Sequence, residues 1–262
     1  MSSLARQSAI VTGAGRGIGR SIALRLAAEG ARVTLVARSS GQLEETADRI
    51  RRAGGEALVF AADVTSRDAV TAAAQAAAAT FGPVSILVNN AGIPGPYGPI
   101  GVIDPGEWWA AQEVNVLAAL LFMSAVMPGM RAAGGGRIVN IVSSAGIEPV
   151  PHLSAYAVSK CTVIRLTETV DLESRGAGVR AFALHPGTIT TQMSHATVSS
   201  AQAQRWLPEG VQMLKSRAPE DSARDLTRCC EVVAALAAGK YDALGGRYLD
   251  LWWDLDARRE ES

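Results

Sequence analysis

The stretch Thr12-Gly13-Ala14-Gly15-Arg16-Gly17-Ile18-Gly19 decides the fold, because it places a glycine-rich turn between an apolar strand and a helix. The apolar run 8–12 precedes the turn, and residues 16–29 have the apolar spacing of a helix. Three glycines in a Gly-x-x-x-Gly-x-Gly spacing allow a tight turn, so that the helix N-terminus can receive a pyrophosphate. A glycine-rich turn is also common as a structural loop, but this position favours a phosphate site. The three are Gly13, Gly17 and Gly19.

Strands and helices alternate along the whole sequence. The predicted strands are 8–12, 32–37, 57–61, 86–89, 137–142, 179–185 and 247–251. The predicted helices are 16–29, 42–53, 66–81, 107–131, 154–174 and 220–238. Strict alternation is typical of a parallel sheet with helices on both faces, since right-handed crossovers cover both sides. We therefore predict one α/β domain over residues 1–262, a Rossmann-type doubly wound parallel sheet.

The charge balance gives no reason to expect a polyanionic partner. The chain has 262 residues, with 25 lysines and arginines against 25 aspartates and glutamates. This balance argues against nucleic acid or an anionic membrane as a partner. The most apolar run, 114–127, is interrupted by Asn115 and is too short to cross a bilayer. No signal peptide is apparent in residues 1–7, and the three cysteines lack zinc spacing, so we expect a reduced cytoplasmic protein without a metal.

Chemically informative residues gather where the predicted strands end. In open parallel sheets, ligands bind in the crevice at the carboxyl ends of the strands. The residues at or just past these ends are Gly13, Arg38, Asp63, Asn89, Ser143 and Pro186. The sequence therefore predicts a single ligand-binding edge.

The end of the second predicted strand bears on the choice of cofactor. A ligand with a free ribose 2′-hydroxyl calls for an acidic residue there. The sequence instead has the uncharged Ala37 followed by Arg38, and Arg16 lies in the glycine turn. Two guanidinium groups suit a 2′-phosphate and offer no acceptor to a free hydroxyl. We predict NADP(H) rather than NAD(H); the alternative is that both arginines are solvated surface residues.

A tyrosine and a lysine lie one helical turn apart in Tyr156-Ala157-Val158-Ser159-Lys160. Bringing a tyrosine pKa from ~10 to ~7 requires roughly 4 kcal/mol. A cation about 5 Å away at an effective dielectric of ~20 supplies about 3 kcal/mol. A second cation, such as an oxidised nicotinamide ring, would complete the shift. The pair is a candidate proton donor, although this spacing alone is common on surface helices.

Taken together, these residues resemble the short-chain dehydrogenase/reductase family in its compact single-domain form, over nearly the whole chain. The matching pieces are 12–19, Asp63-Val64, Asn89-Asn90-Ala91-Gly92, Asn115, Ser143, Tyr156 with Lys160, and 186–191. Chance rarely produces seven matches in the order in which the family has them.

The resemblance implies a catalytic tetrad of Asn115, Ser143, Tyr156 and Lys160. Ser143 would polarise the substrate carbonyl, and Tyr156 would give or take the proton. Lys160 would hold the nicotinamide ribose and lower the pKa of Tyr156, while Asn115 would hold a water that links Lys160 to solvent. Ser144 competes for the role of Ser143, and the spacing of thirteen residues to Tyr156 favours Ser143.

The resemblance also implies contacts at the adenosine end of the cofactor. Asp63 would meet the adenine amino group and Val64 its edge. Asn90 and Gly92 would line the adenosine side, whereas Asn89 is expected to brace the central strands.

At the nicotinamide end, the resemblance implies that the backbone of Ile189 bonds the carboxamide. Thr191 would reach the pyrophosphate or the carboxamide. The full expected cofactor set is Gly13, Arg16, Gly17, Ile18, Gly19, Arg38, Asp63, Val64, Asn90, Gly92, Tyr156, Lys160, Pro186, Gly187, Ile189 and Thr191.

The family places a mobile lid over the substrate, here at about 191–214. A closed lid would exclude water from hydride transfer. Apolar residues in this segment suggest a partly hydrophobic substrate, or they are packing residues. They are Met193, Trp206, Leu207 and Met213. Glu148 and His152 lie near the tyrosine helix and are assigned no role.

The resemblance further implies a homo-oligomer, a dimer or tetramer, in which the two longest predicted helices make a dimer face. Trp108 and Trp109 begin the first of these helices. Adjacent helix positions diverge by about 100°, so at most one of the two faces the core. Trp252 and Trp253 would pack at a second interface or near a neighbouring pocket.

These features together predict an NADP(H)-dependent oxidoreductase that interconverts a ketone or aldehyde with an alcohol, acting as a carbonyl reductase. A fold alone guarantees no reaction, so a cofactor-binding sensor or scaffold without turnover is one alternative. Another is the same fold acting on an imine or using NAD(H).

Overall fold

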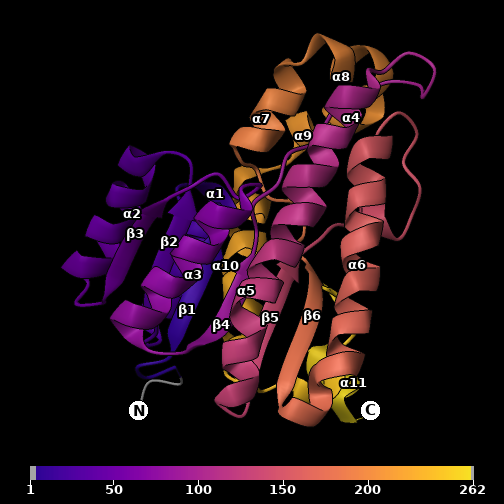
Figure 1. Ribbon diagram of the computed structural model, residues 1–262. Coiled ribbons are helices and arrows are strands. Elements are labelled where there is room, and N and C mark those ends of the chain that lie inside the picture. The colour runs from indigo at the N-terminus through magenta and orange to yellow at the C-terminus, as the bar shows by residue number, and fades with distance from the viewer. Residues whose placement is uncertain (1–3, 261–262) are drawn as a thin grey trace.

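The computed structural model describes residues 4–260, and these form one seven-stranded sheet with all strands parallel (Figure 1). The strand order is β3-β2-β1-β4-β5-β6-β7. The strands are β1 (Ser8–Thr12), β2 (Arg32–Ala37), β3 (Ala57–Ala61), β4 (Val84–Asn89), β5 (Gly136–Ile141), β6 (Val179–His185) and β7 (Tyr248–Asp250). The order changes direction between β1 and β4, which is where doubly wound sheets bind their ligands. The predicted fold class is confirmed.

Helices cover both faces of the sheet, and each face has its own apolar core. One face carries α1 (Gly17–Ala28), α2 (Ser40–Arg52) and α10 (Pro219–Ala237). The other carries α3 (Arg67–Phe81), α5 (Ala118–Ala132) and α6 (Ser154–Ser174). Every strand and helix predicted from the sequence ends within two residues of the observed element.

The segment after β6 contains helices that the sequence did not predict. These are α7 (Gln192–Ser199), α8 (Ala201–Trp206) and α9 (Pro208–Ser216). Figure 1 shows them grouped at the top of the molecule, far from both termini, while the short α11 (Leu255–Glu260) lies near the C-terminus. The predicted lid is therefore a helical layer.

The predicted long helix contains a widened turn. It runs as α4 (Pro105–Gln112), a π-helical segment over Glu113–Leu117, and then α5. The widened turn holds the buried Asn115, and π turns inside α-helices are frequent at functional sites.

The same helix corrects an argument made from the sequence. Pro105–Ala132 is one helix of 28 residues, long and apolar enough to cross a membrane, so the prediction that it is too short was wrong. A single helix of this kind is weak evidence for a span, because core helices of soluble proteins have the same length and composition. Here 56% of its most apolar window is buried inside the protein.

A buried ion pair fixes α6 to the sheet. Asp171 on α6 is fully buried, and its Oδ1 accepts hydrogen bonds from Arg180 Nε at 2.8 Å and from the Ala181 N–H at 3.1 Å. Arg180 Nη2 donates to the other carboxylate oxygen at 3.2 Å. Because Arg180 and Ala181 belong to β6, this contact sets the position of the helix that carries Tyr156 and Lys160.

We expect Asp171→Ala to lower the free energy of unfolding by about 3–5 kcal/mol, because it leaves the Arg180 guanidinium without its buried partner. Urea unfolding followed by circular dichroism measures this change. Arg175→Ala is the matched control: Arg175 contacts the same carboxylate at 3.6 Å, but half of its side chain is exposed, and its loss should cost at most about 1 kcal/mol. Equal losses in the two variants would contradict the anchoring role.

Candidate active site

A cavity of about 320 Å³ lies where the strands end, between the sheet and the lid helices. Its wall includes Ile18 at the start of α1 and the lid residues Met193, Leu207 and Met213. Several residues predicted for catalysis or cofactor binding also line it: Ser143, Tyr156, Pro186, Gly187, Ile189 and Thr191. The structure thus brings together residues that are far apart in the sequence.

The Tyr156 phenol meets Ser143 inside this cavity. Tyr156 lies in the first turn of α6, and Ser143 follows β5 directly. The Ser143 side chain hydrogen-bonds to Tyr156, and its Oγ also accepts from the Ala145 N–H at 3.2 Å. Ser144 lines the same cavity but is exposed. The contact with the phenol therefore favours Ser143 over Ser144.

Lys160 is the buried cation of the site. Its side chain is almost fully buried, its Nζ donates to the Ile141 carbonyl oxygen at 2.8 Å, and the same atom lies 5.5 Å from the centre of the Tyr156 ring. Burial lowers the pKa of Lys160 to about 8, since a buried ammonium loses its hydration. Two further N–H donors of the ammonium remain for a ligand.

The acidic shift expected for Tyr156 does not come from the protein alone. Burial raises the pKa of Tyr156, the hydrogen bond from Ser143 opposes this rise, and the neighbouring Tyr97 adds to it. The Lys160 ammonium was expected to lower the pKa of Tyr156, but the loss of water around the phenolate raises this pKa and is the larger effect. A lower pKa requires a second cation, such as an oxidised nicotinamide ring.

Asn115 braces the site through its side chain. Its Oδ1 accepts from the Ile93 N–H at 2.8 Å, and its Nδ2 donates to the Ile93 carbonyl at 2.9 Å and to Ser159 Oγ at 2.9 Å. Ser159 in turn donates to the Tyr156 carbonyl at 2.7 Å. Both amide donors are thus engaged by protein, so the side chain braces the loop, and the role of Asn115 in holding a water stays a prediction. Sequence reasoning missed Ser159, although it stands inside the tyrosine–lysine stretch.

Gly92 lets the loop after β4 pass close to the catalytic candidates. A Cβ atom at this position would lie 3.1 Å from Asn115 Oδ1 and 3.7 Å from Lys160 Nζ. The structure therefore places Gly92 beside the lysine, rather than only along the adenosine side where the sequence put it.

The glycine turn has the geometry of a phosphate cradle. Gly13 and Gly17 have φ angles of +65° and +53°, which favour glycine. Arg16, the residue before α1, makes no capping hydrogen bond through its side chain, so the first N–H groups of the helix remain available to an anion. These observations fit the pyrophosphate of a dinucleotide.

Asn90 locks this turn to β4. Its Nδ2 donates to the Thr12 carbonyl at 2.9 Å, and its backbone N–H donates to Thr12 Oγ1 at 2.9 Å. A Cβ atom on Gly13 would come within 2.7 Å of that amide nitrogen. Asn90 therefore shapes the turn, and any contact with adenosine is additional. Asn89 bonds Asn140 Oδ1 on β5 at 2.8 Å and braces the central strands, as predicted.

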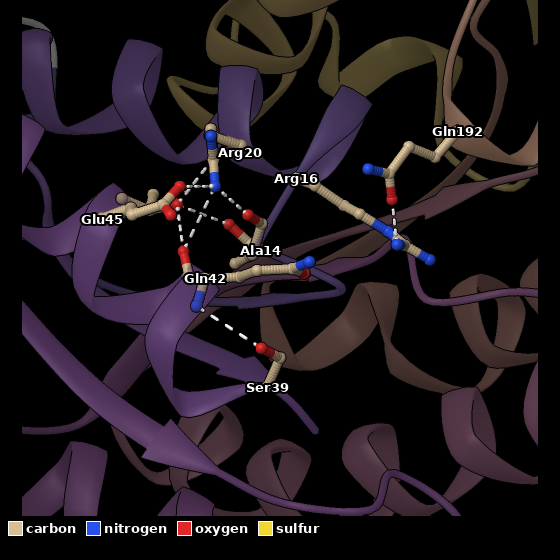
Figure 2. A network of polar contacts seen from close by, with 9 residues as sticks. Ala14, Arg16, Arg20, Ser39, Gln42, Glu45 and Gln192 are labelled. Atoms are coloured by element: carbon tan, nitrogen blue, oxygen red, sulfur yellow. Dashed lines mark hydrogen bonds and ion pairs between the residues drawn. The ribbon is translucent and has the colours of Figure 1, made fainter.

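Two arginines at the turn, Arg16 and Arg20, have different partners (Figure 2), and a third, Arg38, follows β2. Arg20 contacts the Gly15 carbonyl, Thr46 Oγ1 and Glu45, so it stabilises the turn itself. Arg16 is exposed and donates to Gln192 Oε1 at the start of α7, which joins the turn to the lid. Arg38 is exposed just after β2.

Asp63 carries its charge at the end of the neighbouring strand. Its Oδ1 accepts from the Thr65 N–H at 2.9 Å and from the Thr65 hydroxyl at 2.8 Å. These hydrogen bonds, with a smaller contribution from the Arg38 guanidinium, lower the pKa of the Asp63 carboxyl. Val64 beside it is buried. Both residues follow β3 at the edge of the sheet where the strands end, and their contact with adenine stays a prediction.

The loop after β6 is clamped from below by residues that sequence reasoning missed. The buried Asp225 of α10 accepts from the Thr188 N–H at 3.0 Å and from Arg217 Nη2 at 2.6 Å, and Arg217 Nε donates to the Thr188 carbonyl at 3.2 Å. Gly187 has a φ of +80°, and a Cβ there would lie 2.8 Å from Asp225 Oδ2. No motif links these positions, because the clamp depends on the packing of α10.

The first lid helix, α7, begins close in space to the glycine turn. Thr191 caps α7, because its hydroxyl oxygen accepts a hydrogen bond from the Ser194 N–H at 3.3 Å. A Cβ on Gly17 would lie 3.6 Å from the Thr191 methyl carbon. Thr191 therefore lies near the predicted pyrophosphate position, and its hydroxyl proton remains for a ligand.

Not every residue expected at the pocket lines it. Trp206 packs against the His152 ring with the ring centres 5.4 Å apart, and neither residue is part of the cavity wall. Glu148 is exposed and also lies outside that wall. Trp206 therefore fits the alternative that it is a packing residue, and its ring packs the lid against the loop that precedes α6.

The remaining tryptophans divide between the core and the surface. Trp108 donates to Ser154 Oγ on α6 at 3.2 Å, whereas 61% of Trp109 is exposed, so the expected divergence is confirmed. Trp253 packs edge-on against Tyr248, and Trp252 is half exposed. Within residues 4–260, no group of three or more histidine, cysteine, aspartate or glutamate side chains is arranged to hold a metal ion.

Known proteins resemble this chain over most of its length. A family model described as short chain dehydrogenase matches residues 7–202. A short chain dehydrogenase of Pseudocercospora fijiensis is 34% identical, over 98% of this chain and 83% of its own. A structure of NAD+-bound xylitol dehydrogenase is 29% identical with a TM-score of 0.82, over 94% of this chain and 98% of its own. A Beutenbergia cavernae structure described as an NAD(P)-dependent gluconate 5-dehydrogenase, with NADP bound at low occupancy, is 32% identical with a TM-score of 0.82, over 95% of this chain and 96% of its own.

The depressed pKa of Lys160 predicts a pH dependence of stability. The unfolded chain binds this proton up to about pH 10.5, whereas the folded chain releases it near pH 8, so stability rises with pH between these values. The contribution is about 3 kcal/mol, at ~1.4 kcal/mol for each pH unit. We therefore expect the free energy of unfolding, measured from unfolding curves at pH 7.5–10.5, to increase more with pH in the native chain than in Lys160→Met. The control is Lys215→Met at an exposed position; a slope unchanged in Lys160→Met would contradict the assignment.

Proposed function

The chain belongs to the short-chain dehydrogenase/reductase family, and from that premise we propose that it is an NADP(H)-dependent oxidoreductase that interconverts a ketone or aldehyde with an alcohol. We further propose that it acts as a carbonyl reductase. One observation carries this proposal: the Tyr156 phenol is hydrogen-bonded to Ser143 and lies beside the buried Lys160 ammonium, in a cavity walled by the Pro186 loop.

In this proposal, the residues of the chain manage the proton and the carbonyl oxygen. Ser143 turns its hydrogen bond from Tyr156 to the substrate oxygen, which polarises the carbonyl. Tyr156 then donates its proton to that oxygen, and the resulting phenolate is stabilised by the Lys160 ammonium. Asn115 keeps the loop after β4 and the tyrosine helix in register through Ile93 and Ser159.

A nicotinamide cofactor supplies the hydride to the carbonyl carbon when it is bound. The open N–H groups at the start of α1 and the glycines of the turn suit its pyrophosphate, and the Lys160 ammonium has donors left for its ribose. The clamped loop at Pro186–Thr188, with Ile189 and Thr191, would hold the carboxamide end. Asp63 would accept from the adenine amino group, and Val64 would contact the edge of the ring.

The preference for NADP(H) rests on charge. Arg38 is exposed just after β2, where the chain has no acidic side chain to receive a ribose 2′-hydroxyl. Arg16 is a weaker candidate because Gln192 already accepts from it. Related structures hold NAD+ in one case and NADP in another, so use of NAD(H) is the competing assignment.

We also propose a cytoplasmic homo-oligomer, a dimer or tetramer, without nucleic acid or membrane as a partner. Exposed apolar side chains on the α4–α5 helix and on α6 support an interface between copies, since they leave large apolar groups in water. These side chains are Trp109, Leu117, Leu120, Val158 and Leu172.

Tyr156→Phe should lower kcat/KM for ketone reduction at least about 100-fold, because phenylalanine has no proton to donate. NADPH binding, measured by fluorescence, should change little, since the ring remains. Ser143→Ala should also lose most activity, whereas Ser144→Ala should not. A sensor or scaffold would bind NADPH without reducing any ketone or imine in any of these proteins.

Arg38→Ala should reduce the ratio of NADPH affinity to NADH affinity by about 10-fold or more, since it removes a hydrogen bond to a charged group. Titration calorimetry with both cofactors measures the ratio. Arg52→Ala, at a largely exposed position on α2, is the control and should leave it unchanged. If Arg38→Ala also leaves the ratio unchanged, the proposed role of Arg38 is wrong.

A further inference from the structure

A second tyrosine stands in the wall of the active-site cavity. Tyr97 lies in the loop between β4 and α4, is 6% exposed and faces the same cavity as Tyr156. Its ring packs with residues of the lid, so the loop and the lid meet at this side chain. These residues are Ala203, Leu207 and Val211, together with Leu153 before α6.

Counting protons fixes the direction of the hydrogen bond that Tyr97 makes. The Tyr97 hydroxyl and Thr197 Oγ1 of α7 are 2.7 Å apart, and Thr197 Oγ1 is also 3.0 Å from the Met193 carbonyl oxygen. A carbonyl oxygen only accepts, so the single proton of Thr197 goes to Met193. The proton of Tyr97 therefore goes to Thr197.

This arrangement leaves the Tyr97 oxygen as an acceptor only. Throughout residues 4–260, no N–H or O–H group donates to it. Burial raises the pKa of Tyr97, so the phenol keeps its proton and cannot turn into a second anionic centre. Tyr97 thus cannot donate to the substrate carbonyl, and its free lone pair is suited to a ligand that brings its own donor.

The rest of the cavity wall limits what that ligand is. Its side chains include no lysine, arginine, aspartate or glutamate, and most of them are apolar. Such a wall offers no counter-ion to a carboxylate or a phosphate, whose burial without one is costly. The wall therefore favours a neutral substrate.

We propose that Tyr97 is a specificity-determining residue that accepts a hydrogen bond from a hydroxyl group of the substrate, so that the chain acts on neutral, largely apolar hydroxyketones and the corresponding diols. Thr197 is the positioning residue, because it takes the proton of Tyr97 and turns the free lone pair toward the cavity. This inference rests on the proposed ketone–alcohol function and deepens it. A substrate without a donor would leave a buried acceptor unpaired, which sites of this kind disfavour.

The test compares matched ketones with the intact enzyme and NADPH. The substrates are acetophenone, hydroxymethyl phenyl ketone and 2-hydroxyethyl phenyl ketone, with the methyl ethers of the last two. We expect kcat/KM for at least one hydroxyketone to exceed that for its ether by about 10-fold, mainly through KM. In Tyr97→Phe, which keeps the ring in the lid cluster, this ratio should fall to nearly 1, while acetophenone is still reduced and the melting temperature changes little.

Variants of Thr197 separate positioning from packing. Thr197→Val keeps the shape but frees the Tyr97 proton, so the preference for the hydroxyketone should fall and the ether, an acceptor, should become the better substrate. Thr197→Ser keeps the hydroxyl and should retain the native ratio. A purely structural role would change the melting temperature in these variants without reversing the preference.

The possible outcomes distinguish the two levels of the proposal. If acetophenone is reduced and the ratio of hydroxyketone to ether is the same in the native chain and in Tyr97→Phe, the role of Tyr97 is overturned while the carbonyl reductase function stands. If none of the ketones is reduced although NADPH binds, the proposed function fails and the inference fails with it. Loss of the preference in Tyr97→Phe with retained acetophenone reduction supports both.

Discussion

The burial of one ammonium group is the constraint on which the rest of the site depends. Lys160 is almost fully buried, and the Ile141 carbonyl at the end of β5 is the protein acceptor that keeps its charge tolerable. Two neighbours leave this contact undisturbed. Gly92 has no side chain that would reach the ammonium, and the Asn115 amide in the widened turn bonds Ile93 and so holds the loop after β4. A buried cation without such support would release its proton or move to solvent.

Much of this arrangement could be predicted from the sequence, because it depends on residues that are close together in the chain. The glycine turn, the tyrosine–lysine spacing and the alternation of strands and helices are short-range patterns, and each predicted strand and helix begins and ends within two residues of an observed one. The spacing also singled out Ser143, which does meet the phenol. Polar residues at strand ends converge because parallel strands all end at one edge.

What the sequence could not predict depends on packing or on solvation. The π turn places Asn115 against Ser159 of α6, and the clamp of Arg217 and Asp225 on Thr188 depends on the docking of α10, and both are contacts between distant parts of the sequence. The rise in the pKa of Tyr156 has the same origin, since an argument from charge and distance carries no information on lost hydration. The choice between pocket wall and packing residue stayed open for Trp206, because apolar character alone does not distinguish the two.

The two tyrosines of the cavity show how partners rather than residue type set a role. Tyr156 has a serine hydroxyl on one side and an ammonium nearby, so two groups beside it oppose the cost of burying its anion, and a bound cationic cofactor would add to them. Tyr97 has a threonine oxygen that takes its proton and no cation among the cavity residues beside it, so its proton stays in place. Tyr156 is therefore suited to donate a proton to the substrate, and Tyr97 is suited to accept a hydrogen bond from it. A cavity that holds both distinguishes the oxygen that reacts from the oxygen that is only recognised.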